Sequence, residues 1–278
     1  MLGSLIIVFR EVIEAGLIVG IVLAVTRGVP RRGFWVAGGV AAGVAGAALL
    51  AIFAGALSNA FSGIGQEVFN ASVLALAVVM LAWHNIWMAS HGREMATQLR
   101  DAGRAVAEGD KDLAALAIVV AIAVLREGSE VVLFLYGVAA SGAGVSGMML
   151  GGVIGLAAGC ALSAAMFFGL VAIPTRHLFS VTTALITFLA AGMAAQCVVF
   201  LQQAGLVTAL SRTVWDTSSI LRDDSLPGRV LHTLFGYVDQ PSGMQVLVYL
   251  AVLGGIFLAT WLASPSPAPA PTPARGKV

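Results

Sequence analysis

The sequence predicts an all-α polytopic membrane protein with seven transmembrane helices, arranged as two inverted three-helix repeats plus a C-terminal helix. Of its 278 residues, 59% are hydrophobic and 10% are charged, whereas a soluble domain usually carries about 25% charged residues. The apolar residues fall in runs long enough to cross a bilayer as helices. The first and fourth runs share a charged motif. This composition excludes an ordinary soluble enzyme and a nucleic-acid binder that relies on a basic face.

Seven apolar runs define the expected membrane helices. They cover residues 4–26, 34–57, 67–89, 113–139, 146–173, 180–204 and 243–262. The membrane domain is therefore expected over 1–262, with repeat one at 1–89, repeat two at 113–204, an outer loop at 205–242 and the last helix at 243–262. Residues 90–112 predict a short amphipathic cytoplasmic helix. The proline-rich residues 263–278 predict a disordered cytoplasmic tail.

The basic residues predict the orientation in the membrane. Ten of the fifteen Lys and Arg residues lie in the 27–32, 93–111 and 176 connections and in the tail, all on one side of the predicted topology. Three others lie in the outer loop, and Arg10 and Arg126 lie within helices. Because positive charge favours the cytoplasmic side, the N-terminus is expected outside and the C-terminus in the cytoplasm.

Small residues recur at every fourth position in the second and fifth runs. In the second run they are Gly39, Gly43, Ala47, Ala51 and Gly55, and in the fifth run they are Gly147, Gly151, Gly155 and Gly159. Such a stripe allows two helix backbones to approach closely, so we interpret it as a packing surface. Its recurrence in corresponding runs supports the repeat. Three helices per repeat would invert the second copy, as is common in transporters.

The motif R-E-x-x-E occurs twice inside apolar runs. Its charged residues are Arg10, Glu11 and Glu14 in the first run and Arg126, Glu127 and Glu130 in the fourth. Each such group costs about 2.5–3.5 kcal/mol at a membrane helix centre, unless it faces a partner or a wet cavity. The glutamates of each motif share a helix face, and each arginine can reach the glutamate four residues later.

If the two motifs meet, they form a site with four carboxylates and two guanidiniums. Such a site suits a small, highly charged, hard cation that prefers oxygen ligands, and it lacks the sulfur ligands that favour Cu(I). An alternative is that the charges form ion pairs that only hold the two helices together. Buried ion pairs stabilise proteins weakly because desolvation offsets their attraction, so a transport site is the preferred interpretation.

At these residues the sequence resembles the oxidase-dependent ferric iron permeases, a family that includes bacterial EfeU-like permeases. That family carries R-E-x-x-E in its first and fourth membrane helices. The resemblance covers residues 1–262 and includes four further segments: Gln66-Glu67-x-Phe69, A-A-G-M-A-A at 190–195, Trp215-Asp216-x-Ser218 and L-F-G-Y at 234–237.

The resemblance implies a high-affinity iron(III) permease in the cytoplasmic (inner) membrane of a bacterium, and not an enzyme. Iron would be its transported ligand, and no permanent cofactor is implied. The expected partners are an extracytoplasmic ferroxidase and a periplasmic iron-binding protein, with membrane lipid around the chain and no nucleic acid. The motif glutamates would be the metal ligands, and the two arginines would orient them.

Four further residues are weaker candidates. The resemblance makes Glu67 a ligand at the outer end of the third helix, where Asn70 stands in place of a second glutamate that such permeases often carry. Asp216 in the outer loop matches the family pattern and could collect cations. Met80, His84 and Met88 share a helix face, which is more typical of packing than of a soft-metal relay. His84 is nevertheless a functional candidate, because ionisable groups inside membranes usually have a role.

Other functions remain open at this point. The same site could carry another cation, such as Fe2+, Mn2+ or Pb2+. A membrane redox or haem-binding subunit is less favoured, because bis-histidine haem needs two facing histidines and only His84 lies well inside a predicted span. A purely structural membrane scaffold would leave the doubled motif unexplained.

Overall fold

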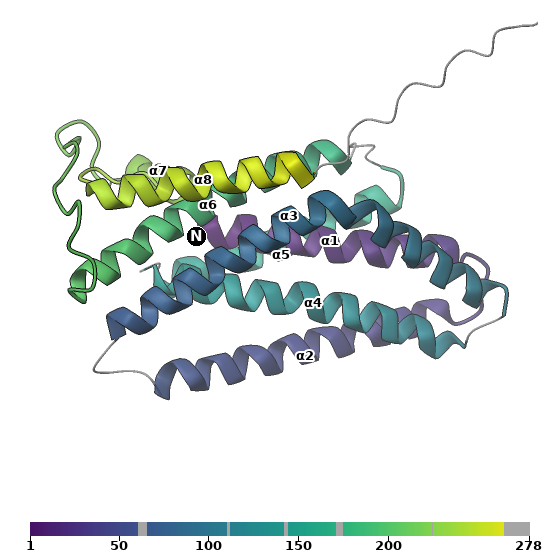
Figure 1. Cartoon of the computed structure of the whole chain (residues 1–278). Coiled ribbons are helices and arrows are strands. Elements are labelled where there is room, and N and C mark those ends of the chain that lie inside the picture. Colours follow the sequence, from purple (N-terminus) through teal and green to yellow (C-terminus); the bar gives the residue numbers. More distant parts are fainter. Residues whose placement is uncertain (61–65, 110–111, 142–143, 171–174, 224, 264–278) are drawn as a thin grey trace, which may run out of the picture.

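The computed structural model describes residues 1–60, 66–109, 112–141, 144–170, 175–223 and 225–263, and these ranges form a helical bundle (Figure 1). Its helices are α1 (Leu2–Val25), α2 (Arg32–Ala60), α3 (Gln66–Ala107), α4 (Leu113–Ala140), α5 (Val145–Phe167), α6 (Thr175–Gln203), α7 (Leu226–Phe235) and α8 (Gly243–Ala263). Within the described ranges, the β-structure is limited to an isolated bridge between Thr213 and Ser242.

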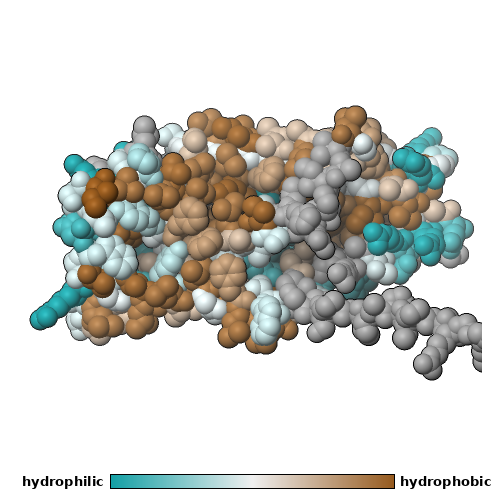
Figure 2. Space-filling model, turned by 90° about the horizontal axis from the view of Figure 1, so that it is seen from above, coloured by the Kyte–Doolittle hydropathy of each residue, from teal (hydrophilic) through white to brown (hydrophobic). Residues whose placement is uncertain are grey.

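Among the residues that the structure describes, five helices are long and apolar enough to cross a membrane. Their candidate spans are Arg32–Ala56, Gln66–Met88, Val145–Phe167, Ser180–Gln203 and Gly243–Ala263. The helices α1 and α4 are also long, at 24 and 28 residues, but each carries three charged residues near its middle. Figure 2 shows apolar residues over the middle of one face of the bundle and hydrophilic residues gathered towards its two ends. This distribution is that of an α-helical membrane protein.

The glycine stripes are packing surfaces, as predicted. A Cβ atom added to Gly155 of α5 would lie 2.6 Å from the backbone oxygen of Leu5 in α1. A Cβ atom added to Gly39 of α2 would lie 2.5 Å from the backbone oxygen of Ala117 in α4. Only glycine permits such close backbone contact. Thus α5 packs along α1 and α2 packs along α4, so the two contacts are reciprocal.

Two apolar clusters lie on either side of the charged motifs. The first includes Ile7 of α1, Leu74 and Leu81 of α3, Phe134 of α4 and Ile186 of α6. The second includes Val22 of α1, Val36 of α2, and Val106, Leu116, Val120 and Val124 from α3 and α4. Along α1, Ile7 precedes the motif and Val22 follows it, so apolar packing encloses the charged residues from both ends.

The prediction of a separate short helix over 90–112 was wrong. Instead, α3 continues without a break for 42 residues to Ala107. Residues 93–107 contain no proline and are rich in good helix formers, so nothing in the chain ends the helix at the membrane edge. Leu99 and Val106 are buried, which ties this extension to the rest of the bundle.

The helix α7 inside the expected outer loop was not predicted. Its N-cap is Ser225, whose Oγ accepts a 3.0 Å hydrogen bond from the Gly228 N–H. Pro227 lies in the first turn, and Gly236 ends the helix with φ of 67°. Serine before the helix, proline in its first turn and glycine after it are standard boundary signals that the sequence contained. Residues 264–278 of the expected tail lie outside the described residues.

Candidate metal centre

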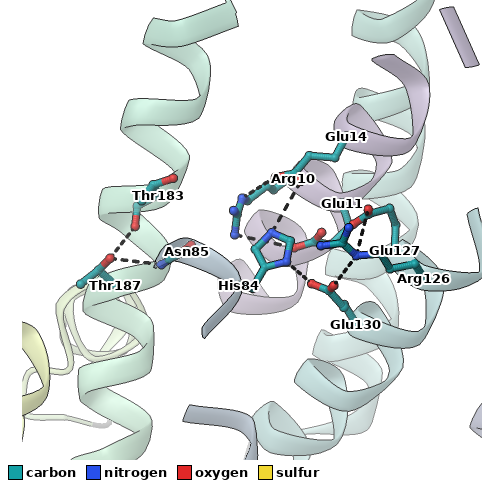
Figure 3. Close-up of polar contacts among 10 residues, drawn as sticks. All are labelled: Arg10, Glu11, Glu14, His84, Asn85, Arg126, Glu127, Glu130, Thr183 and Thr187. Carbon is teal, nitrogen blue, oxygen red and sulfur yellow. Dashed lines mark hydrogen bonds and ion pairs between the residues drawn. The ribbon is translucent and has the colours of Figure 1, made fainter. Parts of the chain in front are cut away.

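The two R-E-x-x-E motifs meet in the middle of the bundle, where α1, α3 and α4 contact one another. Figure 3 shows their side chains converging, together with His84 from α3. Six of these side chains are buried: Arg10, Glu11, Glu14, His84, Glu127 and Glu130. The structure therefore brings together the four predicted glutamates, both arginines and the histidine.

Each arginine pairs with the second glutamate of its own motif, as the helical spacing predicts. Arg10 Nε lies 2.9 Å from Glu14 Oε1, and Arg126 Nε lies 3.4 Å from Glu130 Oε1. The first glutamates lie farther from the arginines. Arg10 Nη1 is 3.8 Å from Glu11 Oε1, and Arg126 Nε is 4.0 Å from Glu127 Oε1. Neighbouring residues point about 100° apart around a helix, which weakens these adjacent pairs.

His84 connects the two motifs. Its Nε2 lies 3.5 Å from Glu14 Oε2, and its Nδ1 contacts Glu130 Oε2. The face formed by Met80, His84 and Met88 was predicted to be a packing surface. This prediction is wrong for His84, whereas Met80 does pack against the first apolar cluster. The sequence spacing placed His84 on a face but could not show which groups that face would meet.

The neighbouring Asn85 was not predicted as a site residue. It is buried, and its Nδ2 donates a 3.3 Å hydrogen bond to Thr187 Oγ1 on α6. Thr187 in turn donates to the Thr183 backbone oxygen at 2.7 Å. This network ties α3 to α6 beside His84 and so helps to hold the imidazole in place. The amide side chain of Asn85 inside an apolar run was the sequence signal that could have identified this residue.

Glu11 and Glu127 present carboxylate oxygens that lack hydrogen-bond donors. Within the described part of the chain, neither oxygen of Glu11 nor Oε2 of Glu127 has a hydrogen-bond partner. Two sets of ligand atoms, each lying within 4.8 Å of one another, are Glu11–Glu14–His84 and Glu11–Glu127–Glu130. Buried carboxylates without donors are unfavourable unless a cation joins them. The donor set therefore fits an oxygen-preferring metal ion.

A cavity of about 390 Å3 borders one side of this centre. Residues of α1, α3 and α4 line it, including Trp87, His91, Glu94, Arg126 and Glu127. The guanidinium carbon of Arg126 lies 4.4 Å from the centre of the Trp87 ring, a distance at which cation–π attraction is effective. The centre thus has a wide space beside its α4 half.

Of the four weaker candidates, Glu67, Asn70 and Asp216 do not take part in this centre. Glu67 is exposed in the first turn of α3 and Asn70 is half-buried one turn later. At 1.5 Å per residue, Glu67 is about 25 Å along the helix from His84. Asp216 is exposed in the loop, where it accepts hydrogen bonds from the Ser218 N–H at 2.9 Å, Ser218 Oγ at 2.6 Å and Gln240 Nε2 at 3.1 Å. These bonds, chiefly those from Ser218, lower the pKa of Asp216.

The chain is similar to known iron permeases along most of its length. The model of the iron permease FTR1 family matches residues 1–263. A ferrous iron permease EfeU from Escherichia coli O6:H1 is 34% identical over 253 residues, covering 89% of this chain and 90% of the relative. The ferrous iron permease EfeU of Yersinia pestis is 32% identical over 252 residues, covering 89% and 88%. No solved structure matches the chain. The chain is a multi-pass membrane protein that belongs to the iron permease FTR1 family.

Proposed function

We propose that this chain moves iron(III) into the cell across the cytoplasmic membrane of a bacterium, through the carboxylate centre on α1 and α4. The observation that carries this proposal is the convergence of four buried glutamates, with ligand atoms grouped within 4.8 Å and several oxygens lacking a donor. Membership of an iron permease family supports iron as the cargo.

The charges explain how the centre selects and holds such an ion. Four buried carboxylates attract a trivalent cation strongly, because charges interact more strongly away from bulk water. Arg10 and Arg126 hold Glu14 and Glu130 at 2.9 and 3.4 Å, so these carboxylates are already oriented before the ion arrives. The arginines also limit the negative charge that accumulates when no ion is bound. Glu11 and Glu127, whose arginine contacts are longer, are the ligands most available to the ion.

We further propose that α1–α3 and α4–α6 are inverted repeats within seven membrane-spanning helices, with α8 as the seventh. The reciprocal packing of α5 on α1 and of α2 on α4 supports this arrangement, because an axis that exchanges α1 with α4 would exchange those two contacts. A site at the junction of such repeats is the usual plan of a secondary transporter. The distribution of the basic residues supports an N-terminus outside and a C-terminus in the cytoplasm.

Iron(II) is the second candidate cargo, and two observations favour it. The relatives described above carry the name ferrous iron permease. His84 adds an imidazole nitrogen to the carboxylates, and iron(II) accepts imidazole ligands readily. If iron(III) is carried instead, an extracytoplasmic ferroxidase must oxidise the iron first, and a periplasmic iron-binding protein would deliver it.

Uptake of radiolabelled iron into proteoliposomes tests both candidates. Iron(III) is supplied as a soluble citrate complex and iron(II) under ascorbate, each with and without excess Mn2+. We expect uptake of iron(III), lost in Glu11→Gln and Glu127→Gln and retained in Asp101→Asn, which removes an exposed acid on α3. Uptake restricted to iron(II) would select the second candidate. Undiminished uptake by both glutamate variants would overturn the carboxylate centre.

A further inference from the structure

The two motif arginines occupy corresponding positions in the sequence but different surroundings in the structure. The side chain of Arg10 is 1% exposed, whereas that of Arg126 is 35% exposed. Arg126 also lines the 390 Å3 cavity, and Arg10 does not. Since each arginine pairs with a glutamate of the centre, the arginine at the α4 half is the one that separates the centre from open space.

Glu127 connects the centre to that cavity. It is 3% exposed, lines the cavity, and carries an Oε2 atom without a hydrogen-bond partner in the described part of the chain. Its ligand atom also lies within 4.8 Å of those of Glu11 and Glu130. An ion in the centre can therefore stay bound to Glu127 while it begins to enter the cavity.

His91 lies on the cavity wall with a nitrogen suited to metal binding. Its Nδ1 lies 2.7 Å from Ser90 Oγ and 3.3 Å from the Trp87 backbone oxygen. Ser90 Oγ itself donates to the Trp87 oxygen at 3.0 Å, so the Nδ1 position is best satisfied as an N–H donor. That tautomer leaves a lone pair on Nε2, the arrangement usual for metal-binding histidines.

Glu94 follows His91 by three residues and lines the same cavity. Its Oε1 accepts a 3.3 Å hydrogen bond from Gln98 Nε2, which orients the carboxylate. The ring of His91 stacks on Trp87 with centroids 5.1 Å apart and planes 11° apart. Trp87 thus contacts both His91 and the guanidinium of Arg126.

We propose that this cavity is the release path for the transported cation, with Arg126 as the barrier and with His91 and Glu94 as a second binding site on the cytoplasmic side. This inference rests on the proposed iron transport. Movement of Arg126 along the Trp87 ring opens the way from Glu127 to the pair. Because His91 and Glu94 are exposed and offer one imidazole and one carboxylate, they hold the ion more weakly than four buried glutamates do. Conduction requires such a weaker onward site, so that the ion can leave.

The first test compares iron binding with iron transport in the full chain. The double variant His91→Ala/Glu94→Gln should transport iron about 10-fold more slowly in proteoliposomes, while the purified protein binds iron at the central site with unchanged affinity. Asp101→Asn is the matched control on the same helix, because Asp101 is exposed and does not line the cavity. Transport by the double variant at the control rate would overturn the second site.

The second test measures the side from which the cavity is reached. The test uses Glu94→Cys in a background of Cys160→Ser and Cys197→Ser. The introduced cysteine should react with a membrane-impermeant maleimide in inside-out vesicles and should not react in intact cells. Reaction from the outer face alone would overturn a cytoplasmic release path. Failure of the proposed function is distinguishable, because it would appear as unchanged transport in Glu11→Gln and Glu127→Gln, whatever the cavity variants do.

Discussion

Glu11 of α1 and Glu127 of α4 place carboxylate oxygens within 4.8 Å of each other, and both residues are buried. Two buried carboxylates this close repel each other when ionised. This repulsion opposes folding, whereas a bound cation would join the two groups. The two carboxylates therefore disfavour the folded, metal-free protein but favour metal binding, and both effects can be measured.

Replacing either carboxylate by its amide should weaken iron binding and stabilise the metal-free protein. Glu11→Gln and Glu127→Gln each remove one ligand charge, so we expect the Kd for iron to rise at least about 10-fold. Loss of the repulsion should leave the thermal unfolding temperature of the metal-free variants equal to or above that of the wild type. Equilibrium binding and unfolding in detergent check both values, with Asp101→Asn as the control. Lower stability together with normal binding would contradict the assignment.

Removing the imidazole of His84 should destabilise the centre. In His84→Ala, the Glu14 and Glu130 oxygens that contact the ring lose a partner, which should lower the free energy of unfolding by about 1–3 kcal/mol. His91→Ala removes an exposed ring that stacks on Trp87, so it should lower stability by less than His84→Ala does. Denaturant unfolding of the metal-free proteins compares them. Equal stability of the two variants would show that His84 does not support the carboxylates.

Adjacent glycines on α2 should respond in opposite ways to alanine. A Cβ atom at Gly39 would lie 2.5 Å from the Ala117 backbone oxygen, whereas one at Gly38 would have no atom within 4 Å. Gly39→Ala should therefore lower the free energy of unfolding by about 1–3 kcal/mol. Gly38→Ala should be neutral or stabilising by up to about 1 kcal/mol, because alanine favours helix. If both variants unfold alike, α2 does not pack on α4 through this face.

Asp223 in the outer loop should tolerate replacement by asparagine, which removes the charge but keeps a side-chain oxygen. Replacement by alanine, which removes that oxygen, should be destabilising. Its Oδ1 accepts a 3.0 Å hydrogen bond from the Asp239 N–H, and Asp239 Oδ2 accepts one from the Asp223 N–H at 3.4 Å. Partial burial, with the Asp239 carboxylate nearby, raises the pKa of Asp223. A raised pKa in the folded state means that its contribution to stability is present in acid and is lost as pH rises through that pKa.

Asp223→Asn should therefore flatten the pH dependence of loop stability, and Asp223→Ala should destabilise the loop by about 1 kcal/mol through loss of the acceptor. The change in slope will be small, because the residue is largely solvated. Hydrogen exchange of residues 225–242 between about pH 4 and about pH 7 measures both effects. A steeper dependence in Asp223→Asn would contradict the predicted sign.

Features that repeat along one helix could be predicted from the sequence. The Arg10–Glu14 and Arg126–Glu130 pairs follow from a spacing of four residues at 3.6 residues per turn. The glycine stripes follow from the same periodicity, and the structure places them where helices meet. The capping residues of α7 also mark its position in the sequence, although no helix was predicted within the outer loop.

Features that join different helices required the tertiary structure. His84 and Asn85 are adjacent in sequence, yet one contacts the glutamates of α1 and α4 and the other contacts α6. Which neighbour each side chain meets depends on the rotation and register of packed helices, and periodicity alone does not set them. The position of the cavity beside Glu127 has the same origin.

The sequence by itself therefore determined the membrane class, the doubled motif and the charges that must be buried, because hydropathy and helical spacing are local properties. Only the tertiary structure decided that Arg10 is sealed while Arg126 borders a cavity, since matching motifs acquire different surroundings when unequal helices pack around them. The long helix α3 is the main reason that the surroundings of Arg10 and Arg126 differ. It carries His84 into the centre and extends past Trp87 to line the cavity with His91 and Glu94.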